Sequence, residues 1–121
     1  MDKGDNYILR SKTNWKYNDE GKIIEKLFSD YEYKKVNKTK KTLTSTKKDV
    51  YEYKIKDVMP DYYYYENDVL RMKTIYSNED SYVTTFYFDG GFVVDSVYEN
   101  ATHTKDIFYS NGNIIRQKVY E

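Results

Sequence analysis

Apolar and polar residues alternate over short stretches of the chain, and residues that favour tight turns separate these stretches. A period of two places successive side chains on opposite faces of a strand, whereas a helix needs apolar residues every three to four positions. Residues 22–28 come nearest to a helical spacing, and their place between turn signals favours a strand. The pattern therefore predicts an all-β protein.

The C-terminal half contains an eleven-residue repeat. Six tyrosines lie at this spacing, namely Tyr65, Tyr76, Tyr87, Tyr98, Tyr109 and Tyr120. Two positions after each of the first five comes a turn-favouring residue, namely Asn67, Asn78, Asp89, Asn100 and Asn111. Eleven residues accommodate a strand of about seven residues followed by a tight turn. Two such units would form a 22-residue hairpin repeat.

The turns suggest a register for this part of the sheet. Asn111-Gly112 and Asp89-Gly90 are the strongest turn signals, because a two-residue type I′ loop needs positive φ at both positions. If every turn from Asn67 onward is such a loop, all six repeat tyrosines lie on one face. The same register places His103 between Tyr98 and Tyr120 on neighbouring strands.

The N-terminal half predicts similar strands with less regular spacing. They are expected at residues 7–12, 14–17, 22–28, 31–36, 41–46 and 50–57, with Pro60 at a turn. The chain then forms one domain, residues 1–121, built as an antiparallel meander of about ten short strands. Because both predicted faces carry aromatic side chains, we expect a curled or barrel-like sheet, or N-terminal hairpins folded over one face.

Two segments resemble a known repeat family. Residues 15–23, Trp-Lys-Tyr-Asn-Asp-Glu-Gly-Lys-Ile, resemble the YD (RHS-type) repeat: an aromatic residue, Tyr, Asp, a short gap, Gly, a basic residue and an aliphatic one. Residues 86–92, Phe-Tyr-Phe-Asp-Gly-Gly-Phe, are a partial second match. The hairpin length is also similar to MORN-variant repeats of small bacterial proteins, some of them antitoxin components, although their Gly-Glu-Trp core is absent. The resemblance implies a β-hairpin-repeat fold that binds rather than catalyses, and it assigns no functional residue.

Composition removes several kinds of chemistry. The chain has no cysteine, which excludes disulfides, thiolate metal sites and a cysteine nucleophile. His103 is the only histidine, and no glycine-rich phosphate loop is present, so we expect no metal, no cofactor and no enzyme activity. With a mean hydropathy of −0.95, no stretch reaches the ~18 apolar residues of a membrane helix, and no integral membrane segment is expected.

The source and location are less constrained. A composition rich in Lys, Asn, Tyr and Ile suggests an AT-rich bacterial gene. The first five residues lack the apolar core of a secretory signal. A chain whose leader had been removed would look the same, so a cytoplasmic location and export both stay open.

The formal net charge of zero conceals a strong asymmetry. Residues 1–56 hold 15 basic and 9 acidic residues, whereas residues 57–121 hold 5 and 11. Seven lysines and no acidic residue occur in residues 34–48, namely Lys34, Lys35, Lys38, Lys40, Lys41, Lys47 and Lys48. This run is a candidate docking surface for an acidic protein, a phosphate polymer or an anionic lipid surface, or else a solvated edge strand. Because the other half is acidic, nucleic acid is not the expected partner.

Four consecutive tyrosines form the second candidate binding site. Tyr62, Tyr63, Tyr64 and Tyr65 would place two rings on each face of a strand. Exposed tyrosines are common anchors at protein interfaces and stacking surfaces for sugars. Two interpretations stay open: at least two rings are exposed and Tyr62 to Tyr64 bind a partner, or all four pack within the sheet.

These features favour a non-enzymatic protein-binding module. One form is an immunity or antitoxin protein that occludes a toxin, and another is a small exported envelope protein. A first alternative is a carrier that holds a small ligand inside a closed up-and-down barrel. A second is a hydrolase that uses Asp95 and Asp106, which the predicted register sets opposite each other. The oligomeric state does not follow from the sequence.

Overall fold

The computed structural model describes residues 7–34, 41–54 and 59–121, with only the backbone at residues 7–9, 32–34, 41 and 42. These ranges contain nine strands and no helix. The strands are β1 (Tyr7–Tyr17), β2 (Ile23–Lys34), β3 (Lys41–Glu52), β4 (Asp61–Glu66), β5 (Val69–Tyr76), β6 (Tyr82–Tyr87), β7 (Phe92–Glu99), β8 (Thr102–Ser110) and β9 (Asn113–Val119). The prediction of an all-β fold is confirmed.

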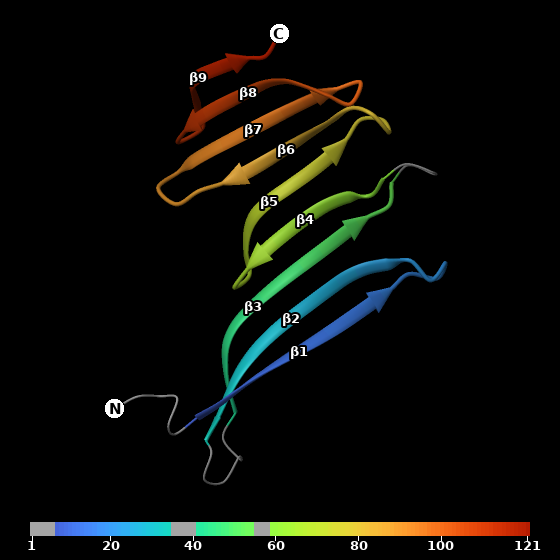
Figure 1. Cartoon of the computed structure of the whole chain (residues 1–121), viewed down its shortest axis with the longest axis vertical. Helices are drawn as coiled ribbons and strands as arrows, with labels where there is room; N and C mark the ends of the chain where they lie inside the picture. Colours follow the sequence, from blue (N-terminus) through green and yellow to red (C-terminus); the bar gives the residue numbers. More distant parts are fainter. Residues whose placement is uncertain (1–6, 35–40, 55–58) are drawn as a thin grey trace. The chain divides into compact units, whose positions relative to one another are not determined.

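The strands form one antiparallel meander in which each strand pairs with its neighbours in the chain (Figure 1). The strand order runs from β1 to β9 without a crossover, and β1 and β9 are the two edges. The sheet is therefore not closed into a barrel. The hairpin meander predicted from the eleven-residue repeat is confirmed.

The N-terminal strands are longer and fewer than expected. The predicted strands 7–12 and 14–17 form the single strand β1, and 22–28 and 31–36 merge into β2. The sequence predicts a break between the last two of these strands, but Asp30 lies inside β2, where hydroxyls on both neighbouring strands bind its carboxylate. Ser11 donates at 2.6 Å and Ser45 at 2.9 Å. Residues 35–36 and 55–57 of the predicted strands lie outside the described residues.

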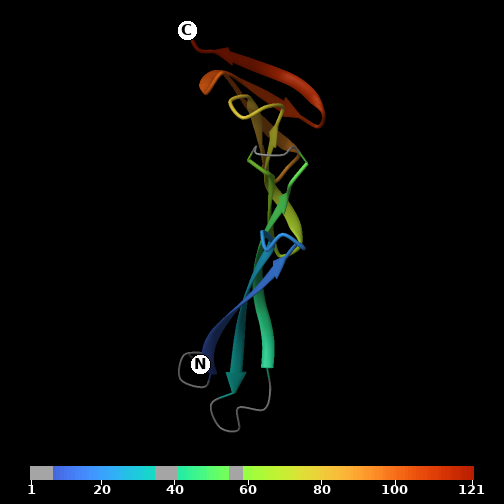
Figure 2. The same cartoon turned by 90° about the vertical axis from the view of Figure 1, so that its right-hand side faces the viewer.

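Contacts within the chain define two compact units. The N-terminal unit comprises Met1–Asp49 and Tyr65–Val69, and the C-terminal unit comprises Val50–Tyr64 and Leu70–Glu121. The view turned by 90° shows the strands of each unit as a single layer (Figure 2). That the whole chain behaves as one domain stays a prediction.

Three of the five predicted two-residue turns form as expected. Backbone φ is positive at both central residues of Asn67-Asp68, Asn100-Ala101 and Asn111-Gly112. The predictions for Asn78-Glu79 and Asp89-Gly90 are wrong. Longer loops replace them, closed by hydrogen bonds from the Ser77 N–H to the Ser81 carbonyl and from the Phe88 N–H to the Phe92 carbonyl, both 2.9 Å.

The two segments that resemble the YD repeat share the hydrogen bond that closes the turn and a glycine with positive φ. The Asn18 N–H donates to the Lys22 carbonyl at 2.9 Å, which matches the bond between Phe88 and Phe92. The glycine three positions after the donor has φ of +80° at Gly21 and +81° at Gly91. A residue with a Cβ rarely adopts this conformation, so the Tyr-x-Asp-x-Gly spacing shared by both segments has a direct structural cause.

The strand register of the C-terminal unit differs from the prediction by one residue. Tyr76 pairs with Tyr82 rather than Ser81, and Tyr87 pairs with Val93 rather than Phe92. Directly beside the two-residue turn at Asn100-Ala101 the predicted pairing is correct, because Tyr98 pairs with His103. A bulge after this pair, and another between Phe108 and Tyr109, then shifts the register. Each of these hairpins thus contains one residue more than a regular hairpin with a two-residue turn.

This extra residue decides which face each tyrosine occupies. A slip of one residue moves a side chain to the other face of the sheet. Residues eleven apart therefore alternate between faces instead of sharing one. Face A of β5 to β9 carries Tyr76, Tyr98 and Tyr120, and face B carries Tyr87 and Tyr109. The prediction that all the repeat tyrosines share one face is wrong.

Two similar faces leave no side for a core. Among the described side chains no hydrophobic residue is buried, and the buried residues are Ser29, Asp61 and Thr85. The expectation that hairpins or a barrel wall would cover one face is not met by the described residues. Cross-strand contacts between side chains, each worth roughly 0.2 to 1 kcal/mol, replace a core as the source of stability.

Gly91 is the glycine whose replacement should disturb this sheet most. A Cβ at Gly91 would overlap the Asn111 side chain, whereas a Cβ at Gly112 meets nothing within 4 Å. Both residues have positive φ, so alanine at either position costs about 1 kcal/mol in backbone strain. We expect Gly91→Ala to lower the free energy of unfolding, measured by urea denaturation, by roughly 1 kcal/mol more than the control Gly112→Ala. Equal losses would show that the contact between the two turns contributes nothing.

Candidate binding surface

A ladder of aromatic rings on face A crosses strands β5 to β8 and ends at Tyr120, the residue after β9. The centroid of Tyr76 lies 5.0 Å from that of Tyr82, and Tyr82 stacks on Tyr98 at 4.6 Å with an interplanar angle of 12°. His103 continues the stack 4.7 Å from Tyr98 and 4.1 Å from Tyr120. The prediction that His103 lies between Tyr98 and Tyr120 is confirmed. Because the rings cover one another's faces, they offer mainly their edges to a partner.

Asp106 lies beside this ladder and holds three strands together. Its carboxylate accepts hydrogen bonds from the Ser96 hydroxyl at 2.7 Å and the Tyr120 phenol at 2.5 Å, and it contacts His103 Nε2 at 2.7 Å. Partial burial opposes ionisation of Asp106, but the hydrogen bonds from Tyr120, Ser96 and His103 outweigh it and lower its pKa. The same hydrogen bond with Asp106 raises the pKa of Tyr120.

Face B repeats this arrangement eleven residues earlier. The Thr85 hydroxyl donates to Asp95 at 2.6 Å, just as Ser96 donates to Asp106. Partial burial, followed by the charge of Asp95 and a hydrogen bond with it, raises the pKa of Tyr109. Hydroxyl, carboxylate and phenol therefore recur in the same order on successive strands. The acidic residues of the repeat are structural links between strands.

The carboxylate pair expected for a hydrolase does not form. Asp95 pairs with Ile107, whereas Asp106 pairs with Ser96. The two side chains therefore project from opposite faces of the sheet. The prediction that Asp95 lies opposite Asp106 is wrong because the register differs by one residue.

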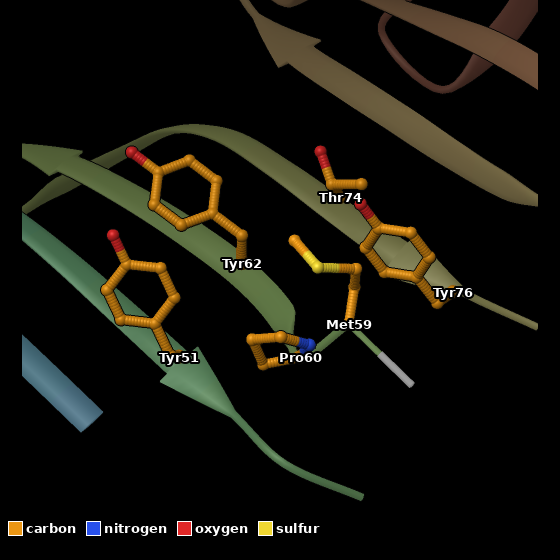
Figure 3. A pocket seen from close by; sticks show the side chains of 6 residues that line it. All are labelled: Tyr51, Met59, Pro60, Tyr62, Thr74 and Tyr76. Carbon is orange, nitrogen blue, oxygen red and sulfur yellow. The ribbon is translucent and has the colours of Figure 1, made fainter. Parts of the chain in front are cut away.

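A hollow of about 290 Å³ lies beside the Tyr76 end of the ladder. Three tyrosines, a methionine, a proline and a threonine line it, namely Tyr51, Tyr62, Tyr76, Met59, Pro60 and Thr74. Figure 3 shows the Met59 side chain between the rings of Tyr62 and Tyr76. Met59 is 63% exposed, and Tyr51 lies 5.4 Å from Tyr62 between ring centroids. The hollow is an apolar, hydroxyl-edged surface at this end of the ladder.

The four consecutive tyrosines lie in β4, and none of them is exposed. All four side chains are half-buried, as the packed interpretation expected. Tyr62 lines the hollow, Tyr65 lies under the ammonium of Lys48 at 4.7 Å, and burial raises the pKa of Tyr63. Of the predicted site residues Tyr62, Tyr63 and Tyr64, only Tyr62 belongs to the hollow.

The lysine run falls mainly outside the described side chains. Lys35, Lys38 and Lys40 lie outside the described residues, and only the backbone is described for Lys34 in β2 and Lys41 in β3. Lys47 and Lys48 lie inside β3. The docking role of the run therefore stays a prediction.

A buried carboxylate near the hollow forms an ion pair with a partly exposed lysine. Asp61 is only 3% exposed. It forms a 2.7 Å ion pair with Lys54 and accepts a 2.9 Å hydrogen bond from the Tyr76 backbone N–H. The hydrogen bond with Asp61 raises the pKa of Lys54, although partial burial opposes this. Asp61 follows the only proline of the chain and looks like a turn residue, so no local pattern indicates that it is buried.

Other kinds of site are not found in the described part of the chain. No group of three or more histidines or carboxylates there could hold a metal ion. No helix there is long and apolar enough to span a bilayer. No protein family model, curated protein or solved structure matches the chain.

The Asp106 hydrogen bonds predict how stability depends on pH. The pKa of Asp106 in the folded protein lies below its ordinary value of 3.8. Ionised Asp106 thus stabilises the fold above that pH, and this stabilisation is lost as the pH falls through the lower folded-state pKa. In urea denaturation, we expect the stability difference between the wild type and Asp106→Asn to be largest near neutral pH and to shrink in acid.

Tyr120→Phe provides the control for this experiment. It keeps the ring in the ladder but removes the phenol that donates to Asp106. We expect an acid dependence between those of the wild type and Asp106→Asn. A stability difference that does not change with pH would contradict the assignment of Asp106 as the link between the strands.

Proposed function

We propose that this chain is a non-enzymatic protein-binding module. The observation that carries the proposal is exposed apolar surface without a core. Eleven large hydrophobic side chains of the described residues are exposed, while none is buried. Surface of this kind, when it gathers in patches, marks interaction sites in soluble proteins.

The best-defined patch lies where two turns meet. The Asn111 N–H donates to the Gly91 carbonyl at 2.9 Å, which places the loop before β7 beside the turn before β9. Four exposed apolar residues lie at these turns, namely Phe88, Phe92, Ile114 and Ile115. They surround the end of the sheet rather than one face, since Phe92 lies on face A and Ile114 on face B. We call these four residues the turn patch. Each side chain is about half exposed, so its replacement opens no cavity in a buried core.

The resemblance to YD and MORN-variant repeats supports the same proposal. Members of these groups usually bind rather than catalyse, and the positive φ shared by Gly21 and Gly91 is consistent with the motif. Within this proposal the chain acts as an immunity or antitoxin protein, or as an exported envelope protein. A toxin gene beside the gene for this chain would favour the first form.

The two alternatives have less support. The carrier needs a closed barrel, but β1 and β9 remain edges of the sheet. The hydrolase needs two carboxylates on one face, but Asp95 and Asp106 lie on opposite faces. Neither alternative gains an observation from the described residues.

The turn patch provides the test. We expect the tagged chain to capture one protein from a lysate of the source organism, and Phe88→Ser with Ile115→Ser to reduce this capture at least about tenfold. Two buried apolar contacts at an interface together account for such a change. The measurement is quantitative mass spectrometry of the captured proteins.

Tyr17→Ser is the matched control, because Tyr17 is also exposed but belongs to the N-terminal unit. Its capture should equal that of the wild type. A chain that captures nothing above background, or a patch variant that captures as well as the wild type, would contradict a binding role for this patch.

A further inference from the structure

The outer edge of β9 presents backbone groups that pair with no described strand. The Tyr120 N–H donates to the Thr104 carbonyl at 2.8 Å, so the backbone groups of Tyr120 point toward β8. In an antiparallel pair these directions alternate along the strand. The N–H and carbonyl groups of Gln117 and Val119 therefore point away from β8. Among the described residues no strand pairs with this edge.

Two cations stand at fixed positions along this edge. Arg116 lies over the Phe108 ring at 5.5 Å, and Lys118 lies over the Tyr120 ring at 5.0 Å. Contact with a ring face restrains a long side chain, so both positive charges stay on face A, two residues apart. β9 contains no acidic residue.

The charge argues against a second copy of the chain as the occupant. Pairing β9 with another β9 brings two further cations to the junction. β1 is the other edge, and its charged residues are also basic, namely Arg10, Lys12 and Lys16. Like charges across a strand pair are destabilising, and basic residues on an edge strand suppress such self-association.

Face B of β9 carries exposed aliphatic side chains on either side of Gln117. Val119 is 66% exposed and Ile114 54% exposed. A strand that pairs with β9 thus meets cations on one face and, on the other, aliphatic side chains separated by one amide side chain. Because side chains of a strand alternate between faces, the complementary strand alternates acidic and apolar residues.

We propose that the β9 edge is a docking site for an acidic, extended segment of a partner protein, which adds to the sheet as an antiparallel strand. Backbone hydrogen bonds to Gln117 and Val119 supply affinity, and Arg116 and Lys118 select acidic side chains. This inference rests on the proposed protein-binding function and names the chemistry of the partner.

The test uses the full chain and a defined probe, an acetylated heptapeptide of alternating Glu and Val. The control probe replaces each Glu with Lys. We expect the Glu peptide to shift the backbone amide NMR signals of β9 and to bind at least about tenfold more tightly than the Lys peptide. Arg116→Glu with Lys118→Glu should reverse this preference. Equal binding of both peptides would overturn the proposal.

A backbone substitution separates strand addition from simple charge attraction. Gln117→Pro removes an N–H that points to the outer edge and leaves the bonds to β8 in place, which is where edge strands tolerate proline. We expect it to abolish binding of the Glu peptide, while Gln117→Ala binds as the wild type does. Unchanged binding by Gln117→Pro would also overturn the proposal. The amide spectrum of each variant shows whether the sheet is intact.

The two proposals can fail separately. If the lysate experiment captures a partner but the Glu peptide does not bind, the binding function stands and the assignment of the β9 edge is wrong. If the peptide binds as expected but no partner is captured, the protein-binding function of the turn patch fails instead.

Discussion

The strand register governs the rest of this structure. Each hairpin of the C-terminal unit contains one residue more than a regular hairpin with a two-residue turn. The extra residue lies in a longer loop or in a bulge, such as the one after the Tyr98 and His103 pair. In this register each eleven-residue repeat is rotated by half a turn relative to the repeat before it, so equivalent side chains lie on opposite faces. Both faces then receive the same kinds of side chain, and neither can become the single apolar side that a core requires.

Polar links take over part of the role of a core. Asp106 on face A and Asp95 on face B each accept a hydroxyl from the neighbouring strand, and Asp30 does so in the N-terminal unit. Buried Asp61 is satisfied by Lys54 and by a backbone N–H. Carboxylates that resemble catalytic groups in the sequence are thus bonded as structural links between strands.

The sequence predicted much of the fold and less of the surface. The tyrosine spacing and the asparagines after it predicted strands β4 to β9 closely, because turn chemistry is local. The sequence pattern could not reveal the bulges, because these depend on how neighbouring strands twist and pair. The one extra residue in each hairpin places Asp95 and Asp106 on opposite faces. It also pairs Tyr82 rather than Ser81 with Tyr76, so that Tyr82 belongs to the ladder. In β2 the carboxylate of Asp30, which lies at a predicted break between strands, is bonded to both neighbouring strands, and no local pattern shows this.

Alternation of the repeat between faces has a consequence for how such a chain can change its length. Adding or removing one eleven-residue repeat in the C-terminal unit keeps the link of hydroxyl, carboxylate and phenol, because this link recurs every eleven residues. It also rotates all later strands by half a turn about the sheet axis. An odd or even number of repeats therefore decides which side of the sheet a terminal feature faces. Duplication of one hairpin, which adds two repeats, preserves a binding geometry, whereas duplication of one strand inverts it.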